Sequence, residues 1–468
     1  MRFNILTASL LALAATPFTT AWLPTKDNGV IRGVNLGGLF IMEPWMQFSQ
    51  WSAMGCGPYK SEFDCVMNLG QAKADAAFQS HWQTWITESD FQQMVASGIN
   101  TVRIPIGYWI LESLVYKDSE HFPRGGYAYL LKTCDLARKY GLYVILDLHG
   151  APGAQISDNP FTGQYAPTPG FYQDYQYARA ITFLGWLTKK IHSRPEFATV
   201  GTLQVLNEPL AYQPAVTQTL CSTFYPAAYA RIRGVESSKG IPKAKQLHVM
   251  FMDRKWGAGD PDQHLATTEG ALYDYHKYVK WDTSVTANRQ SYMKYSCTAS
   301  LKTDCRNPLV VGEWSLSVPD NLQESPEFST NSADAVAWFQ GWFLAQVQMY
   351  ERSGMGWVFW NWKSTLGDWR WSYMDAVNAG VIPRNLAAAV TKNVCAPYVG
   401  KRDVEEGVVD TGAGVGVNGT STEEVVVRGK TPEPTAVRDV RRHVGGLRHR
   451  SLRHSHHHHH GRLLAPSS

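Results

Sequence analysis

The chain has 468 residues, of which 18% are charged and 12% are aromatic, with 17 Trp. This composition is typical of a well-packed globular protein, and the length allows one large domain or two or three average ones. The formal net charge of +4 is too small to indicate a nucleic-acid partner, and the body of the chain contains no basic stripe.

The first 21 residues have the pattern of a secretory signal peptide. Arg2 precedes an apolar stretch over residues 5–15, and small residues follow at positions 19–21. The apolar stretch is too short to span a bilayer, and no later run reaches transmembrane length. We therefore expect a secreted, extracellular protein with no membrane partner and a mature chain that begins near Trp22.

The seven cysteines of a secreted chain are expected to form disulfides. Four of them lie in pairs that each flank a short loop and could close locally: Cys56 with Cys65, and Cys297 with Cys305. Cys221 and Cys395 remain open as alternative partners, and Cys134 lies in an amphipathic segment and is expected to be the odd, buried thiol. Because no CxxC pair exists, no zinc site is indicated and we expect no metal held by these cysteines.

Short apolar runs alternate with amphipathic segments that end at glycine from residue 30 onward, which predicts a parallel α/β architecture. Eight strands are predicted, over residues 31–36, 101–105, 143–148, 203–206, 248–252, 271–276, 309–313 and 356–360. Helices are predicted over residues 78–97, 127–140, 175–191, 217–235 and 333–352. Each strand leaves polar or aromatic residues at its C-terminal end, so the sequence predicts a (β/α)8 TIM barrel in one domain over residues 22–400.

The composition changes after residue 400. Residues 401–468 lose almost all aromatic residues and gain Val, Gly, Thr, Arg and His, so we expect a disordered C-terminal tail. The tail contains the glycosylation sequon Asn418-Gly419-Thr420. It also contains a run of histidines at residues 456–460, to which we assign no function.

Two of the predicted strands each end near a glutamate, one at Glu208, just before Pro209, and one at Glu313. A (β/α)8 barrel places its catalytic groups at the C-terminal ends of its strands. A pair of carboxylates in that position indicates glycoside hydrolysis. The alternative is that both side chains are salt-bridge partners at the barrel rim, and the strand-end position of both makes that alternative less favourable.

Five ordered motifs resemble glycoside hydrolase family 5, and among its members the fungal β-glucanases that include exo-β-1,3-glucanases and β-1,6-glucanases. The motifs cover residues 31–38, 101–107, 147–153, 206–209 and 312–314, and the likeness extends over most of residues 28–397. The resemblance implies that Glu208 is the acid/base and Glu313 the nucleophile of a retaining enzyme. It implies no cofactor, and the tail has no counterpart in the family.

The resemblance also implies a set of substrate-binding residues: Glu43, Arg103, His149, Asn207, His276, Tyr278 and Trp362. Asn207 resembles the contact to the sugar 2-hydroxyl, and Glu43 resembles a hydroxyl-binding residue near the non-reducing side of the cleft. Arg103 is expected beside Glu313, where it would lower the pKa of that carboxyl, although a purely structural salt bridge would have the same placement.

The aromatic and histidine members of this set each have an alternative structural role. His149 and His276 end strands and could bond sugar hydroxyls or orient the carboxylates, although a strand-end His is more often structural. The motif of residues 274–278 favours a functional His276 and Tyr278. Trp362 resembles the platform under the sugar at the cleavage point, and Trp360 is the alternative that would belong to the core.

Departures from the exo-β-1,3-glucanase pattern bear on the linkage. Leu39 stands where those enzymes carry an aromatic residue, and Trp281 and the longer loop around Phe161 do not preserve their acceptor-side clamp. The insertion at residues 51–65 is more similar to the β-1,6-glucanase branch.

We therefore expect a secreted, monomeric, retaining endo-β-1,6-glucanase whose partner is the β-glucan of fungal cell walls. The close alternative is an exo-β-1,3-glucanase (glucan 1,3-β-glucosidase). A non-catalytic glucan-binding protein or a structural wall protein attached through its tail is a different alternative, and the presence of both glutamates argues against the first of these two.

Overall fold

The computed structural model describes residues 29–302, 304–306 and 308–399. All of these residues belong to one unit of the chain, residues 1–407. The expected signal peptide at residues 1–21 and the expected tail at residues 401–468, with its sequon and histidine run, lie outside the described residues.

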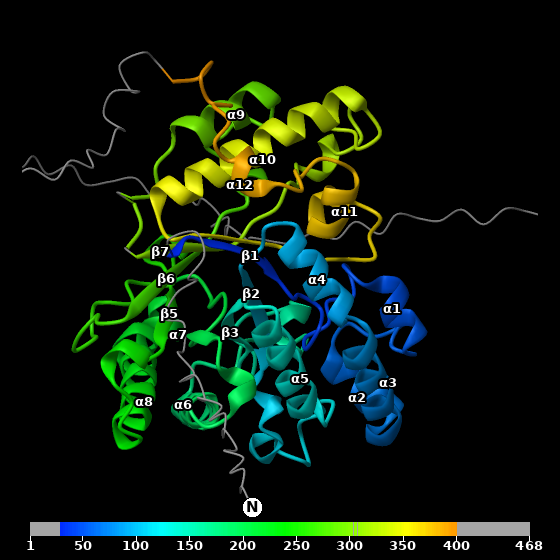
Figure 1. The fold of residues 1–468 in the computed structure, drawn as a ribbon. Coiled ribbons are helices and arrows are strands. Elements are labelled where there is room, and N and C mark those ends of the chain that lie inside the picture. The colour runs from blue at the N-terminus through cyan, green and yellow to red at the C-terminus, as the bar shows by residue number, and fades with distance from the viewer. Residues whose placement is uncertain (1–28, 303, 307, 400–468) are drawn as a thin grey trace, which may run out of the picture. The chain divides into compact units, whose positions relative to one another are not determined.

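Eight parallel strands close into a barrel in chain order, and the helices lie around it (Figure 1). The strands are β1 (Ile31–Asn35), β2 (Thr101–Gly107), β3 (Tyr143–Gly150), β4 (Val200–Gln204), β5 (His248–Met252), β6 (Ala271–His276), β7 (Leu309–Glu313) and β8 (Gly356–Phe359). Gly33 of β1 pairs with Thr101 on one side and with Val358 on the other, which closes the barrel. The predicted (β/α)8 TIM barrel is confirmed.

The helices differ from the prediction mainly in where they are interrupted. They are α1 (Phe48–Ala53), α2 (Glu62–Leu69), α3 (Gln71–Thr84), α4 (Glu88–Ala96), α5 (Gly126–Lys139), α6 (Asp174–Ile191), α7 (Pro214–Thr219), α8 (Tyr225–Ser238), α9 (Arg289–Thr298), α10 (Ala333–Ser353), α11 (Tyr373–Asn378) and α12 (Leu386–Ala389). The single helix predicted over residues 78–97 is wrong, because Thr87 starts a new helix through a capping box with Asp90. The helix predicted over residues 217–235 is likewise divided, by a π-helical turn at Leu220–Phe224.

Strand β4 lies earlier in the chain than predicted. The sequence predicted residues 203–206, whereas the strand covers Val200–Gln204. Pairing continues beyond its end, since Val205 N–H donates to the Met250 carbonyl and Asn207 N–H donates to the Leu148 carbonyl. These bonds explain how Asn207 still lies at the C-terminal end of the barrel although the strand proper ends three positions before it.

The inner face of the barrel changes from apolar to polar along its strands. Seven buried apolar residues form a closed cluster drawn from six strands: Ile31, Tyr143, Ile145, Met250, Leu272, Val310 and Val358. Side chains two positions apart share one face of a strand, so the same inward rows continue toward the C-terminal ends. There they carry polar and charged residues: Asn35, Arg103, Asp147, Gln204 and Asp274, all of them buried. The apolar cluster fills the base of the barrel, and the polar layer is the floor of the site.

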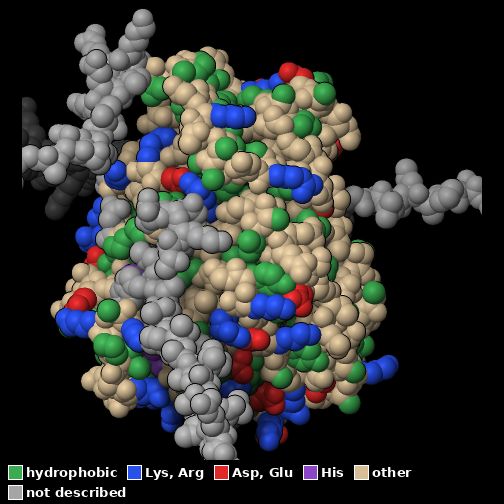
Figure 2. All heavy atoms as spheres, viewed as in Figure 1, with side chains coloured by type: hydrophobic (Ala, Val, Ile, Leu, Met, Phe, Trp, Pro, Cys, Tyr) green, Lys and Arg blue, Asp and Glu red, His purple; other side chains and the backbone are tan. Residues whose placement is uncertain are grey.

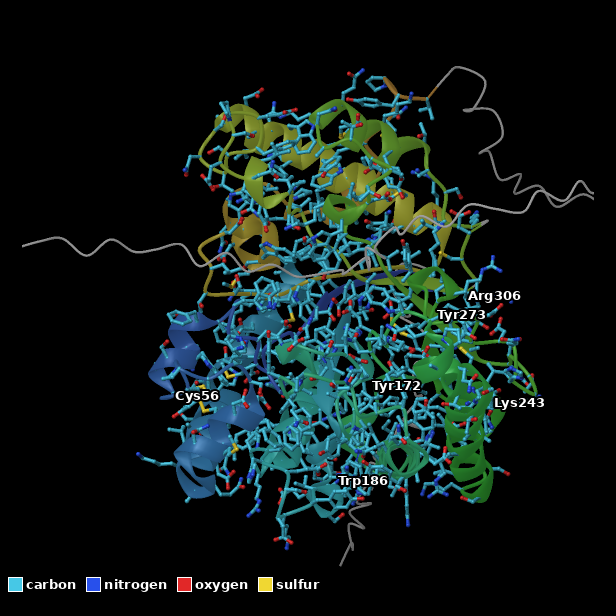
Figure 3. The ribbon with its side chains drawn as sticks, turned by 180° about the vertical axis from the view of Figure 1, so that it is seen from behind. Cys56, Tyr172, Trp186, Lys243, Tyr273 and Arg306 are labelled. Carbon is cyan, nitrogen blue, oxygen red and sulfur yellow. A yellow bond between two sulfur atoms is a disulfide. The ribbon has the colours of Figure 1, made fainter. Side chains whose placement is uncertain are left out.

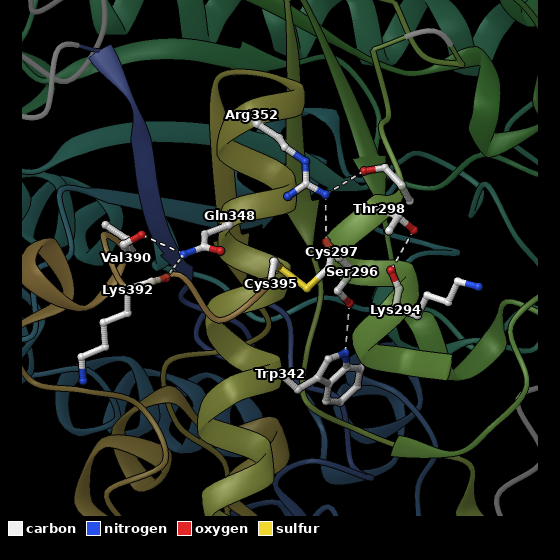
Figure 4. The surroundings of a disulfide bond; sticks show 11 residues. Lys294, Ser296, Cys297, Thr298, Trp342, Gln348, Arg352, Val390, Lys392 and Cys395 are labelled. Carbon is white, nitrogen blue, oxygen red and sulfur yellow. Dashed lines mark hydrogen bonds between the residues drawn. A yellow bond between two sulfur atoms is a disulfide. The ribbon is translucent and has the colours of Figure 1, made fainter. Parts of the chain in front are cut away.

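Two disulfides are present among the described residues, and only one of them joins a neighbouring pair of cysteines as expected from the sequence. Cys56 pairs with Cys65 as expected, but Cys297 pairs with Cys395 rather than with the nearby Cys305. Figure 4 shows the second bond joining α9 to the segment that follows α12, beside α10. Cys134 is a buried free thiol as predicted, and Cys221 and Cys305 are buried free thiols as well.

Side chains from α10 fix the same region. Arg352 donates to the carbonyls of Ser296 and Ala299, and Gln348 donates to the carbonyls of Val390 and Lys392 (Figure 4). The C-terminal segment is therefore tied to the helical layer by hydrogen bonds as well as by the disulfide.

The outer surface mixes charges of both signs. On the face drawn in Figure 2, Lys and Arg side chains are scattered among acidic and uncharged ones rather than gathered in a stripe. None of the helices in the described part of the chain is long and apolar enough to cross a membrane.

Candidate active site

Glu208 and Glu313 face each other at the C-terminal end of the barrel. Glu313 is the last residue of β7, and Glu208 follows β4 with a φ of 34°, in the left-handed region that non-glycine residues rarely occupy. A carboxylate oxygen of each lies within 4.8 Å of the other, together with a ring nitrogen of His276. Strained backbone of this kind persists where the surrounding structure holds it and is concentrated at functional sites.

Arg103 organises the floor beneath the two carboxylates. Its fully buried guanidinium donates to Glu313 Oε1 at 2.9 Å and contacts Asp147 Oδ2 at 2.9 Å. Its remaining hydrogen bonds go to three amide oxygens, those of Asn35, Gln204 and Asn207. Burial disfavours the charge on Arg103, but Asp147 and Glu313 outweigh it and raise its pKa above its usual range, so the cation is retained.

Arg103 lies beside Glu313 as expected, but Arg103 is not the strongest influence on the pKa of Glu313. Burial raises the pKa of Glu313, and the charge of Glu208 adds to this, whereas His276 and Arg103 act in the opposite direction. The predicted lowering of the Glu313 pKa by Arg103 is therefore outweighed by burial. Tyr278, whose own pKa is raised well above 10 by burial and by Glu313, donates its hydroxyl proton to Glu313 Oε2 at 3.0 Å.

His276 lies between three carboxylates. Its Nδ1 is 2.5 Å from Glu208 Oε1 and 3.5 Å from Glu313 Oε2, and its Nε2 is 3.1 Å from Asp274 Oδ2. Burial works against the charged ring, but Glu313 and Asp274 outweigh it and raise the pKa of His276 to about 10. In its protonated form the ring donates one N–H to Glu208 and the other to Asp274.

Asn207 carries a donor that is ready for a ligand. Its Oδ1 accepts from Arg103, and its main-chain carbonyl accepts from Gln155. Its Nδ2 is buried and makes no hydrogen bond within the described residues. Leaving a buried donor unpaired costs about 1–3 kcal/mol, and a sugar hydroxyl would remove that cost.

His149 and Trp360 lie next to each other where β3 and β8 end, beside the two glutamates' end of the barrel. His149 Nδ1 is bonded to Asp147 Oδ2 at 2.7 Å, and its ring lies parallel to that of Trp360, with centroids 5.8 Å apart and an interplanar angle of 7°. The ring of Phe161, from the long loop after β3, meets His149 edge-on at 5.4 Å.

The structure places the two candidate platform residues, Trp362 and Trp360, in different surroundings. Trp362 is 1% exposed, donates its indole N–H to Asp90 of α4 and stacks against Tyr373 of α11. It therefore packs between the barrel and its outer helices. Trp360 instead belongs to a small aromatic cluster at the site, with Met46, Trp371 and, packed against them, Trp45 and Tyr278.

Glu43 lies on the loop after β1 and is 6% exposed. Its Oε2 accepts the indole N–H of Trp45 at 2.8 Å. Burial raises its pKa to about 8 against the effect of that bond, and the charges of Glu313 and Glu208 add to the rise. Glu43 thus lies within the electrostatic reach of both carboxylates.

The group of Glu208, His276 and Glu313 is also the one set of potential metal ligands found in the searched part of the chain. Its polar atoms already have partners within the protein. His276 is hydrogen-bonded to Glu208 and Asp274, and Glu313 accepts from Arg103 and Tyr278. The cluster is arranged to share protons.

Sequence reasoning missed two carboxylates, Asp147 and Asp274. Each stands two residues before a site histidine on the same strand, and each hydrogen-bonds that histidine. The signal was the repeated Asp-x-His spacing, since residues two apart on a strand share a face. Asp274 also accepts the main-chain N–H of Gly312, which fixes β7 next to Glu313.

The family profile described as cellulase (glycosyl hydrolase family 5) matches residues 68–365. The chain belongs to glycosyl hydrolase family 5. The family expected from the motifs is confirmed, and the protein is a glycosidase of the β-glucanase kind.

Relatives within family 5 extend over most of the chain. A probable glucan endo-1,6-beta-glucosidase B of Neosartorya fischeri is 50% identical over 403 residues, covering 83% of this chain and 98% of that relative. A glucan endo-1,6-beta-glucosidase B of Emericella nidulans is also 50% identical, over 84% of this chain and 92% of that relative. A probable glucan 1,3-beta-glucosidase A of Aspergillus fumigatus is 30% identical, over 79% and 91%.

A solved structure supports the fold. The crystal structure of rutinosidase from Aspergillus niger matches with a TM-score of 0.58 and 18% identity, covering 75% of this chain and 98% of that chain.

Proposed function

We propose that the protein is a secreted, retaining endo-β-1,6-glucanase of fungal cell-wall glucan, with Glu313 as nucleophile and Glu208 as acid/base. The retaining mechanism is supported by one observation: a carboxylate oxygen of Glu313 and one of Glu208 lie within 4.8 Å of each other. Retaining glycosidases hold their two carboxyl groups about 5–5.5 Å apart, whereas inverting enzymes need about 6.5–9.5 Å to admit a water. The identity of 50% to glucan endo-1,6-beta-glucosidases supports the linkage.

In the first step, a Glu313 oxygen attacks the anomeric carbon while the bond from that carbon to the leaving sugar oxygen breaks. Arg103 and Tyr278 hold the Glu313 oxygens by hydrogen bonds and so orient them and favour the ionised form. The Glu208 carboxyl, which shares a short hydrogen bond with His276, gives its proton to the leaving oxygen and becomes a carboxylate. The result is a glycosyl ester of Glu313 and a released sugar chain.

In the second step, water attacks the anomeric carbon and gives a proton to Glu208, while the bond to Glu313 breaks and the carboxylate is released. Two inversions restore the β configuration. Asn207 Nδ2 is the donor we assign to the sugar 2-hydroxyl, a contact that strengthens as charge develops on the ring. His149, Glu43 and the ring of Trp360 complete the proposed contacts to the sugar.

The 1,6 linkage is tested by comparing pustulan, a β-1,6-glucan, with laminarin, a β-1,3-glucan. We expect soluble oligosaccharides from pustulan as early products and much slower turnover of laminarin. Early release of glucose alone from laminarin, at a rate above that on pustulan, would favour the exo-β-1,3-glucanase instead. The 30% identical glucan 1,3-beta-glucosidase makes that the second candidate.

A further inference from the structure

A short segment closed by the Cys56–Cys65 disulfide, which we call the clasp (residues 56–65), touches two separate loops at the catalytic end of the barrel. Figure 3 labels Cys56 beside the first helices of the chain. One of the two loops follows β1 and carries Glu43; the other follows β3 and carries Phe161. None of the proposed catalytic contacts uses a residue of the clasp.

The first attachment is made by Glu62. Its side chain is completely buried, and its Oε1 accepts the main-chain N–H of Met42 at 2.9 Å. Met42 immediately precedes Glu43, so this bond fixes the backbone from which the Glu43 carboxyl projects. Glu62 Oε2 makes no hydrogen bond within the described residues.

Glu62 acts as a neutral hydrogen-bond acceptor and not as a charged group. Burial raises its pKa to about 8, and the bond from Met42 only partly opposes this rise. A buried carboxyl without a cationic partner is retained in its neutral form. A glutamine at this position has the same length and the same acceptor oxygen, so it is a matched substitution.

The second attachment is to the loop after β3. Phe63 N–H donates to the Gly163 carbonyl at 3.0 Å, and the Lys60 ammonium lies 4.4 Å from the centre of the Tyr165 ring. Gly163 ends the short helical turn Pro160–Thr162, which includes Phe161, the residue whose ring meets His149. The clasp therefore joins the Glu43 loop to the Phe161 loop.

We propose that the clasp raises the affinity for β-1,6-glucan by fixing the separation between these two loops, with Glu62 as the positioning residue. The inference rests on the proposed action on β-1,6-glucan. Each 1,6 linkage contains an extra rotatable bond, so the free chain is flexible and loses more conformational entropy on binding than a 1,3-linked chain. Walls that are held in place before the substrate arrives limit what the protein itself loses, which is how preorganisation raises affinity.

The test compares Glu62→Ala with Glu62→Gln on pustulan, after circular dichroism has shown that each variant is folded at the assay temperature. Glu62→Ala removes the acceptor from Met42 N–H, and we expect KM to rise about tenfold, a change of ~1.4 kcal/mol, with kcat within twofold of wild type. Glu62→Gln should keep both constants within twofold. Equal KM in wild type and Glu62→Ala would overturn the proposal, as would a Glu62→Gln variant as impaired as Glu62→Ala.

The disulfide gives a second test that does not depend on Glu62. The double variant Cys56→Ser/Cys65→Ser should raise KM for pustulan. The matched control is Cys297→Ser/Cys395→Ser, whose bond lies against α9 and α10 (Figure 4) and should affect stability without raising KM. Equal KM values in the two double variants would overturn the proposal. A wild-type enzyme that does not cleave pustulan would instead refute the proposed function, so the two failures are distinguishable.

Discussion

Arg103→Lys should damage both stability and catalysis, because the guanidinium serves five acceptors that a lysine cannot all reach. Those acceptors are side-chain oxygens of Asn35, Asp147, Gln204, Asn207 and Glu313. An ammonium has three donors, and Asp147 Oδ2 keeps its bond from His149, so at least one buried acceptor is left without a partner. At about 1–3 kcal/mol for such an acceptor, the free energy of unfolding should fall by about 2 kcal/mol.

The measurement is urea unfolding followed by tryptophan fluorescence, together with kcat on pustulan. The matched control is Arg306→Lys. Arg306 pairs with Asp260 and Asp262 at the surface, near Tyr273 (Figure 3), and exposed pairs contribute at most about 1 kcal/mol. An Arg103→Lys enzyme with stability and kcat equal to those of the Arg306→Lys control would refute the role of Arg103 as the organiser of the site.

Three further predictions follow from the site. Glu313→Ala should lower kcat on the order of 10⁴-fold, with partial rescue by azide. Glu208→Ala should keep most of its activity on substrates with good leaving groups. Near-wild-type turnover of pustulan by either variant would refute the assigned catalytic roles. Trp360→Ala should raise KM, while Trp362→Phe, which loses the bond to Asp90, should lower the melting temperature and leave KM unchanged; the opposite pattern would restore Trp362 to the cleft. Glu62 keeps a proton in the folded protein that it releases in the unfolded chain, so the free energy of unfolding should fall between pH 4.5 and about 8, by about 1.4 kcal/mol per pH unit. Glu62→Gln should abolish this contribution. Equal slopes of unfolding free energy against pH in the two proteins would contradict the buried neutral carboxyl.

The barrel could be predicted from the sequence because the strand signal is local. The predicted strands over residues 248–252 and 309–313 each contain an uninterrupted run of four residues without a polar side chain, 249–252 and 309–312, and the structure reproduces both strand ranges. The two catalytic candidates were predictable for the same reason, since Glu208 and Glu313 each follow such a run. Interruptions of helices were missed, because the capping of α4 by Thr87 depends on side-chain geometry within a continuous amphipathic pattern.

Which of two nearby tryptophans faces the cleft could not be predicted from spacing alone. Trp360 and Trp362 are two apart and leave the strand together, and Trp362 is drawn into the core by Asp90, a residue more than 270 positions away in the chain. The partner of Cys297 was open for a related reason, since Cys395 reaches α9 only after the whole barrel has closed. The pKa of His276 likewise could not be predicted, because it depends on carboxylates from three different strands or loops.

The retaining mechanism on β-1,6-glucan is tested most directly by proton NMR of pustulan during the first minutes of hydrolysis. We predict that the new reducing ends appear first as the β anomer, on oligosaccharides longer than glucose, and that the α anomer grows in later by mutarotation. First appearance of the α anomer would contradict a nucleophilic Glu313 placed within 4.8 Å of Glu208, and would require a water between the two carboxylates instead.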